Sequence, residues 1–129
     1  MKIFISYKFE GEDLKSLEEM LLNVKRILEK NGNTVFTTLF EGKKLKSNKE
    51  IMDKALNHIN ESDSQLIIIN SAEKSEGLLL EAGYSIAKNK KIILAVKKGI
   101  QTKWLKDYAY QKVEFETLED LYKQLEKVK

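Results

Sequence analysis

The 129-residue sequence contains no cysteine and no proline. Without cysteine, neither a disulfide nor a cysteine-ligated metal site can form. No apolar run is long enough to span a membrane. The chain opens directly on the apolar residues 3–6, with no hydrophobic leader before them. We therefore expect a cytoplasmic protein that does not associate with membranes.

The sequence also lacks a strong excess of either charge. Its 23 basic and 20 acidic residues give a net charge of +3 and are mixed along the chain. Basic residues gather only in the segment Gly42–Lys49 and around residues 88–98. A nucleic-acid-binding protein more often concentrates Lys and Arg on one face with aromatic residues between them. We therefore expect no polynucleotide partner, although one phosphate group is compatible with the sequence.

Two sites that many enzymes use are absent or poorly supported. The first apolar run is followed by YKFEGED, whose single glycine excludes the glycine-rich phosphate loops of dinucleotide and P-loop proteins. The only histidine, His58, lies beside Asn57 and fits a packing role better than catalysis or metal binding. The acidic pair Glu12–Asp13 is most simply the start of a helix. We expect neither a metal nor an organic cofactor.

Five short apolar runs alternate with helical patterns. The strands are expected at 2–6, 34–38, 66–69, 92–96 and 113–115, and the helices at 14–30, 49–61, from about 75, around 104–109 and at 118–128, with a loop at 39–48. Because the runs at 66–69 and 92–96 are continuously apolar, they indicate strands buried on both faces of a parallel sheet. The sequence predicts one α/β domain over residues 1–129, a doubly wound five-stranded parallel sheet in the flavodoxin-like order 2-1-3-4-5, with helices on both faces.

Glu81 has unusual neighbours for a helical glutamate. The residues three and four positions away are Gly77, Leu78, Tyr84 and Ser85, and none is a lysine although lysine is abundant in this chain. Two interpretations stay open from this pattern alone: Glu81 faces a crevice, or it is a half-exposed acid near a helix N-terminus.

The expected strand order favours the first interpretation of Glu81. Ligands of such sheets bind outside the carboxyl ends of the strands where the order reverses, here between the first and third strands. That rule selects the segments Tyr7–Gly11 and Asn70–Gly77, and Glu81 follows the second. A carboxylate and a tyrosine hydroxyl are sufficient for attack at an acetal-like carbon, as in glycosyl transfer. Glu81 and Tyr7 are the candidates.

The run SDSQLIIINSAEKSEGLLLEAGYSIAKNKKIIL, residues 62–94, resembles the signature region of nucleoside 2-deoxyribosyltransferases and deoxynucleoside 5′-monophosphate N-glycosidases. The resemblance implies that Glu81 is the nucleophile and that Tyr7 supports its carboxylate. It further implies a small nucleoside or nucleotide as substrate and a homo-oligomer, a dimer or larger, in which neighbours complete each other's sites.

The same resemblance suggests substrate-binding positions. Ser75 falls where the hydrolases bind the 5′-phosphate and the transferases carry an acidic group, and Glu76 lies beside it. Further candidates for the binding pocket are Asn70, Ser71, Lys8 and Asp53. The sequence departs from the family at Ala55, where an aspartate contacts the sugar; Asp53 is close in sequence but on another helix face.

A second resemblance leads to a different activity. FISYKFEGED, GKKLKSNKEIMDKAL and a glutamate on the helix after the third strand are similar to Toll/interleukin-receptor domains. Some of these domains hydrolyse the nicotinamide glycosidic bond of NAD, with a glutamate that corresponds to Glu81. A third possibility, supported by Ala55, is a non-catalytic nucleotide-sensing or protein-interaction module.

Overall fold

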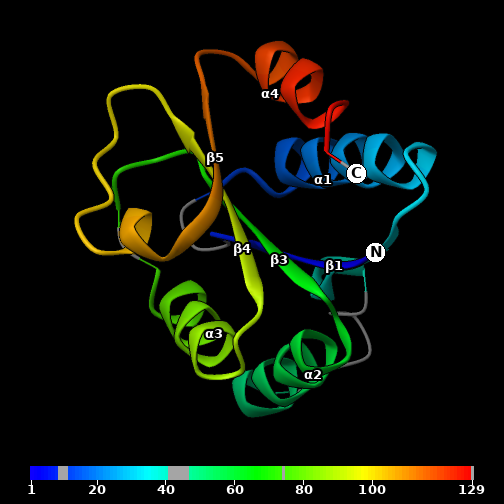
Figure 1. Ribbon diagram of the computed structural model, residues 1–129, viewed down its shortest axis with the longest axis vertical. Coiled ribbons are helices and arrows are strands. Elements are labelled where there is room, and N and C mark those ends of the chain that lie inside the picture. The colour runs from blue at the N-terminus through cyan, green and yellow to red at the C-terminus, as the bar shows by residue number, and fades with distance from the viewer. Residues whose placement is uncertain (9–11, 41–46, 74, 129) are drawn as a thin grey trace.

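The computed structural model describes residues 1–8, 12–40, 47–73 and 75–128. Its centre is a five-stranded parallel sheet in the order β2-β1-β3-β4-β5, as the sequence predicts (Figure 1). The strands are β1 (Lys2–Tyr7), β2 (Thr34–Phe36), β3 (Ser64–Ile69), β4 (Lys91–Lys97) and β5 (Ala109–Phe115).

Two helices cover each face of the sheet (Figure 1). On one face lie α1 (Leu14–Lys30) and α4 (Leu118–Leu125), and on the other lie α2 (Asn48–Glu61) and α3 (Glu76–Ala87). Successive side chains of β1 point to opposite faces of the sheet and so contribute to the hydrophobic core on both sides. Ile3 and Ile5 pack with α1 and α4, whereas Phe4 packs with α2. The predicted doubly wound α/β fold is therefore confirmed.

The helices begin where the sequence offers capping side chains. Asp13, Ser47, Ser75 and Thr117 each accept a hydrogen bond from a backbone N–H in the first turn of α1, α2, α3 and α4. At α1 Asp13 serves the helix start, as expected, whereas Glu12 accepts a hydrogen bond from the Ser71 hydroxyl. Ser75 fixes where α3 begins, which sets how far along the helix Glu81 lies.

The main differences from the expected boundaries are at β2 and at β5. β2 ends at Phe36, and residues 38–40 form a 3-10 turn, η1 (Thr38–Phe40), instead of continuing the strand. β5 begins at Ala109, four residues before the expected start, and the segment before it is a 3-10 turn, η3 (Leu105–Tyr108). Most of the expected loop 39–48, and of the basic segment Gly42–Lys49, lies outside the described residues.

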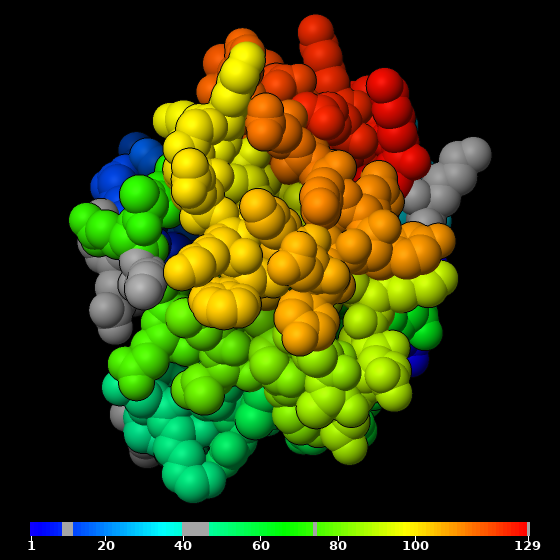
Figure 2. Space-filling model, turned by 60° about the vertical axis from the view of Figure 1, so that its left-hand side comes forward, coloured from blue at the N-terminus to red at the C-terminus, as the bar shows by residue number. Residues whose placement is uncertain are grey.

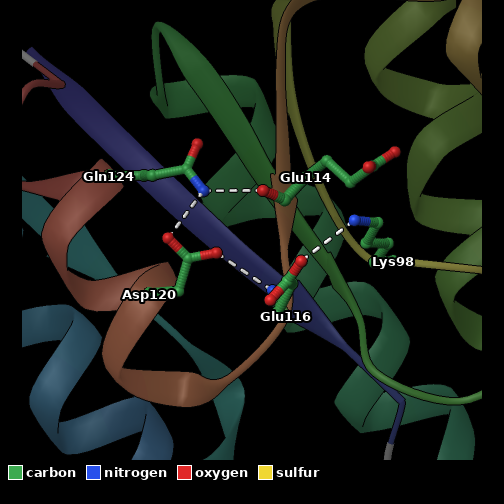
Figure 3. A network of polar contacts seen from close by, with 5 residues as sticks. All are labelled: Lys98, Glu114, Glu116, Asp120 and Gln124. Atoms are coloured by element: carbon green, nitrogen blue, oxygen red, sulfur yellow. Dashed lines mark hydrogen bonds and ion pairs between the residues drawn. The ribbon is translucent and has the colours of Figure 1, made fainter.

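Polar contacts fasten α4 to the end of β5 (Figure 3). Asp120 accepts a hydrogen bond from the backbone N–H of Glu116, and Gln124 donates both to Asp120 and to the carbonyl of Glu114. Lys98 forms an exposed ion pair with Glu116 at 2.9 Å. These contacts hold the last helix against the sheet beside α1.

The lone histidine has the packing position that the sequence favours. The His58 ring is buried on α2 and stacks on Phe36 and Phe4, with ring centroids 4.8 and 5.9 Å apart.

Within the described ranges, no helix is both long and apolar enough to cross a membrane.

Candidate active site

The carboxyl ends of β1 and β3 lie side by side, as the topological argument requires. Tyr7, the last residue of β1, pairs with Ile68 of β3 in the sheet register. Lys8 follows β1, and Asn70 and Ser71 follow β3. The polypeptide then enters α3, so the two segments selected from the sequence meet at one edge of the sheet, except that residues 9–11 and 74 lie outside the described part.

Glu81 lies in the second turn of α3 on the face that packs inward. Its neighbours Leu78, Ala82 and Ser85 on the same face are also buried, and Glu81 itself is only 9% exposed. Because burial removes water from the carboxylate, the pKa of Glu81 rises from 4.5 to about 7, although the nearby Ser6 hydroxyl acts in the opposite direction. The inward-facing interpretation of Glu81 is the one that the structure supports.

The raised pKa has a consequence for stability. Glu81 ionises near pH 4.5 in the unfolded chain but near pH 7 in the fold, so stability decreases as the pH rises through this window and the loss is complete above it. The shift corresponds to a destabilisation of up to roughly 3 kcal/mol at pH 8. We expect Glu81→Gln to unfold at a higher urea concentration than wild type at pH 8, with a smaller difference at pH 5. Equal midpoints at both pH values would contradict a buried, ionisable Glu81.

Tyr7 lies close enough to Glu81 for their charges to interact. Its side chain is partly buried, and burial is the main reason why its pKa is raised. The Thr38 hydroxyl lowers the pKa of Tyr7, and the negative charge of Glu81 raises it. The phenol therefore stays protonated at neutral pH and can donate a hydrogen bond. The structure thus brings together the two residues that the sequence suggested as the catalytic pair.

Lys8 is the centre of a polar cluster at the same edge. Although it is only 9% exposed, its ammonium group donates to Ser71 Oγ at 3.0 Å and to Glu73 Oε2 at 2.9 Å. Ser71 in turn donates to Glu12 at 3.3 Å. The ion pair lowers the pKa of Glu73, which is itself exposed. Lys8 and Ser71, both expected near the substrate, are thus joined to each other, and Glu73 and Glu12 are additional members that the sequence did not suggest.

Three other candidates lie at the start of α3 or just before it. Ser75 Oγ accepts from the Leu78 N–H at 3.3 Å as the helix cap, which leaves its hydroxyl hydrogen for another acceptor. Glu76 is exposed in the first turn, and Asn70 is exposed directly after β3. All three belong to the segment between β3 and the first turn of α3.

Asp53 has a different environment. Its carboxylate is 61% exposed and pairs with Lys49 at 2.7 Å along the outer surface of α2. Ala55, where the resemblance led us to expect an aspartate, is completely buried against Phe4 and Ile59. The structure therefore does not bring Asp53 to Glu81, and Ala55 is part of the core.

A cavity of about 110 Å³ opens at this edge on the α1 side of the sheet. Tyr7, Lys8 and Asn70 line it together with side chains of α1. Glu81 does not line it, and the volume is below the roughly 300 to 1,000 Å³ of typical small-molecule sites. We therefore locate the candidate site by the buried carboxylate and its polar neighbours and not by this cavity.

Two polar residues near Glu81 were not suggested by the sequence. Ser6 and Gln65 lie inside β1 and β3, are at most 1% exposed, and are joined by a hydrogen bond from Gln65 Nε2 to Ser6 Oγ of 2.7 Å. The expected strands gave little signal for this pair, because Gln65 precedes the expected run 66–69 and Ser6 is the last residue of the run 2–6. Across the described residues, no group of three or more His, Asp or Glu side chains is placed to hold a metal ion.

Among the solved structures that cover almost all of this chain are an N-glycosidase and a deoxyribosyltransferase. The CMP N-glycosidase of Clostridium botulinum matches 97% of this chain and 98% of its own, with 18% identity and a TM-score of 0.74. The 2-deoxyribosyltransferase of Bacillus psychrosaccharolyticus matches 95% and 90%, with 22% identity and a TM-score of 0.72. At these identities the likeness shows a shared fold. A search of curated protein sequences gives no match.

Sequence comparison with known families gives a result that covers most of the chain. The family model described as nucleoside 2-deoxyribosyltransferase matches residues 9–119, which include the segment Asn70–Gly77 and Glu81 but begin just after Tyr7 and Lys8. This match confirms the family expected from residues 62–94. The chain belongs to the nucleoside 2-deoxyribosyltransferase family.

Proposed function

We propose that this protein cleaves or transfers the N-glycosidic bond of a nucleoside or nucleotide, with Glu81 as the nucleophile. The observation that supports it best is a buried glutamate, with a pKa of about 7, beside a protonated tyrosine at the switch point of the sheet. A carboxylate in that state is desolvated, and about half of it is ionised at neutral pH, so it is suited to attack. Family membership supports the same reaction class.

The proposed reaction has two steps. In the first, a Glu81 carboxylate oxygen forms a bond to the anomeric carbon of the sugar, and the bond from that carbon to the base nitrogen breaks. The electron pair leaves with the base, which takes up a proton. In the second step, water or another base attacks the same carbon and releases the carboxylate. Hydrolase and transferase differ only in this acceptor.

The surrounding residues have separate roles in this proposal. Tyr7 donates a hydrogen bond that orients the Glu81 carboxylate, since the phenol stays protonated at neutral pH. Ser75, Asn70 and Ser71 line the sugar side, and Glu76 lies toward the base. Lys8 and the free hydrogen of Ser75 are suited to a 5′-phosphate, because one carries a positive charge and the other is a donor at a helix N-terminus.

The experiment that tests the function is chromatography of reaction mixtures with and without an added free base. Each mixture contains a deoxynucleoside, a deoxynucleoside monophosphate, CMP or NAD. Release of base that depends on Glu81 supports the proposal, and exchange onto the added base identifies a transferase. Release of nicotinamide from NAD alone would instead support the activity of Toll/interleukin-receptor domains. If none of these compounds is turned over, the proposed enzymatic activity is contradicted. Calorimetric titration with nucleotides would then test whether the protein is a non-catalytic nucleotide-sensing module.

We also infer, from the family resemblance, that the chain forms a homo-oligomer. Figure 2 looks onto the segment 98–112, coloured yellow to orange, with α3 in green below it. In these elements five large apolar side chains are 51% to 73% exposed: Leu79, Leu80, Trp104, Tyr108 and Tyr110. Exposed apolar surface of this kind is a feature of association surfaces. Light scattering after size exclusion is expected to give at least twice the mass of one chain, and a monomer at micromolar concentration would contradict the inference.

A further inference from the structure

A buried polar pair lies in the sheet where Glu81 packs on it. Gln65 in β3 is completely buried and Ser6 in β1 is 1% exposed. Both belong to the face of the sheet that α2 and α3 cover, because Gln65 alternates with Leu66 and Ser6 alternates with Ile5, whose side chains pack on the α1 face. Their hydrogen bond of 2.7 Å is short and joins two neighbouring strands.

The direction of this hydrogen bond determines what the Ser6 hydroxyl can do. An amide Nε2 can only donate, so Ser6 Oγ accepts and its own hydrogen must point to another acceptor. The nearby acceptor is the Glu81 carboxylate, because hydrogen bonding by the Ser6 hydroxyl lowers the pKa of Glu81. Gln65 thus donates to Ser6, and the Ser6 hydroxyl is in turn the group that lowers the pKa of Glu81.

Packing alone does not explain an amide at this position. Among the described residues, Gln65 Oε1 is buried without a hydrogen-bond partner, which is unfavourable and which an apolar side chain of similar size would avoid. The neighbouring residues of β3, Leu66, Ile67 and Ile68, are all apolar and buried. The Gln65 amide therefore makes one interaction that its apolar neighbours cannot make, the hydrogen bond that it donates to Ser6.

We propose that Gln65 is a positioning residue that directs the Ser6 hydroxyl toward Glu81 and so holds the nucleophile ionised and oriented. The proposal rests on the proposed function, because it assigns the nucleophile role to Glu81. Gln65 does not touch the substrate in this account. It acts through Ser6, and its effect is on the protonation state of Glu81.

The other groups around Glu81 leave this interpretation intact. Within the described part of the chain, burial and the Ser6 hydroxyl are the two influences on the pKa of Glu81. From β1, Tyr7 is affected by the Glu81 charge, and its own pKa lies above neutrality. From α2, Met52 packs next to Gly77 of α3, and the His58 ring is stacked on Phe4 and Phe36. Tyr84, one turn after Glu81, lies under the ammonium of Lys88 at 5.6 Å.

The test is the titration of the Glu81 carboxyl by carbon-13 NMR in protein labelled at glutamate, with Glu81→Gln to assign the signal. In Ser6→Ala the midpoint is expected to rise by roughly one pH unit, because the carboxylate loses a donor. In Gln65→Met it is expected to rise by a smaller amount, and the double variant should match Ser6→Ala alone. In these variants the rate of base release at pH 6 should fall several-fold as well.

The matched control is Ser85→Ala, which removes another completely buried hydroxyl on the face of α3 that carries Glu81. It should change neither the titration midpoint of Glu81 nor the rate of base release.

The sign of the change in Gln65→Met decides the proposal. If the amide were turned over, Oε1 would accept from Ser6, and removing it would free the hydroxyl and lower the midpoint of Glu81. A lowered or unchanged midpoint, or additive effects in the double variant, would overturn the positioning role. Failure of the proposed function is distinguishable: Glu81→Gln would then release base at the wild-type rate, whatever the titration shows.

Discussion

Glu81→Gln is expected to slow base release by on the order of a thousandfold or more, because the amide cannot form the bond to the anomeric carbon. The substitution is nearly isosteric, and at pH 8 it should stabilise the fold, so loss of activity cannot be attributed to unfolding. The measurement is the initial rate of base release at saturating substrate, determined by chromatography.

The matched control for Glu81→Gln is Glu61→Gln. Glu61 is an exposed glutamate at the last position of α2, and this helix runs antiparallel to the strands, so Glu61 lies at the opposite edge of the sheet from the site. It should keep the wild-type rate. A Glu81→Gln rate within a few-fold of wild type would remove Glu81 from the mechanism.

The rate of base release should fall about tenfold for each pH unit below 7. Only the ionised carboxylate can attack, and burial raises the pKa of Glu81 to about 7, so ionised enzyme is lost as the pH decreases through that value. At pH 5 the expected loss is roughly a hundredfold. Tyr7 sets no limit on the alkaline side near neutrality, because its pKa is raised above 10.

The pH dependence is checked from kcat/KM between pH 5 and 9, which reports ionisations of the free enzyme. Circular dichroism at each pH verifies that the protein stays folded. An acidic limb centred near pH 4.5, the ordinary value for a glutamate, would show that the group that limits the rate is not the buried Glu81.

The fold could be predicted because its strands are marked by apolar runs that are buried on both faces. Residues 66–69 and 92–96 contain only Leu, Ile, Ala and Val, and they make up most of the inner strands β3 and β4. The edge strand β5 was recognised only in part. Its first half includes Tyr110, Gln111 and Lys112, which are exposed at the edge and give no apolar run.

The candidate site was predictable to the extent that helix spacing and topology determine it. The absence of a lysine near Glu81 and the switch point between β1 and β3 correctly indicated an inward-facing carboxylate near Tyr7. The sequence could not reveal that Ser6 and Gln65 meet, because their contact depends on the register between two strands that are 59 residues apart. The pair Lys49–Asp53 is different, because the two residues are four positions apart on α2 and helix spacing alone makes them neighbours.

The most direct test of the account is to look for the sugar on Glu81 itself. Enzyme in excess is mixed with a substrate that it turns over, quenched in acid during the release of base, digested, and examined by mass spectrometry. The account predicts a transient peptide that carries one sugar on Glu81, absent from Glu81→Gln. Complete release of base with no sugar on the protein at any time, or with sugar on another residue, would contradict it.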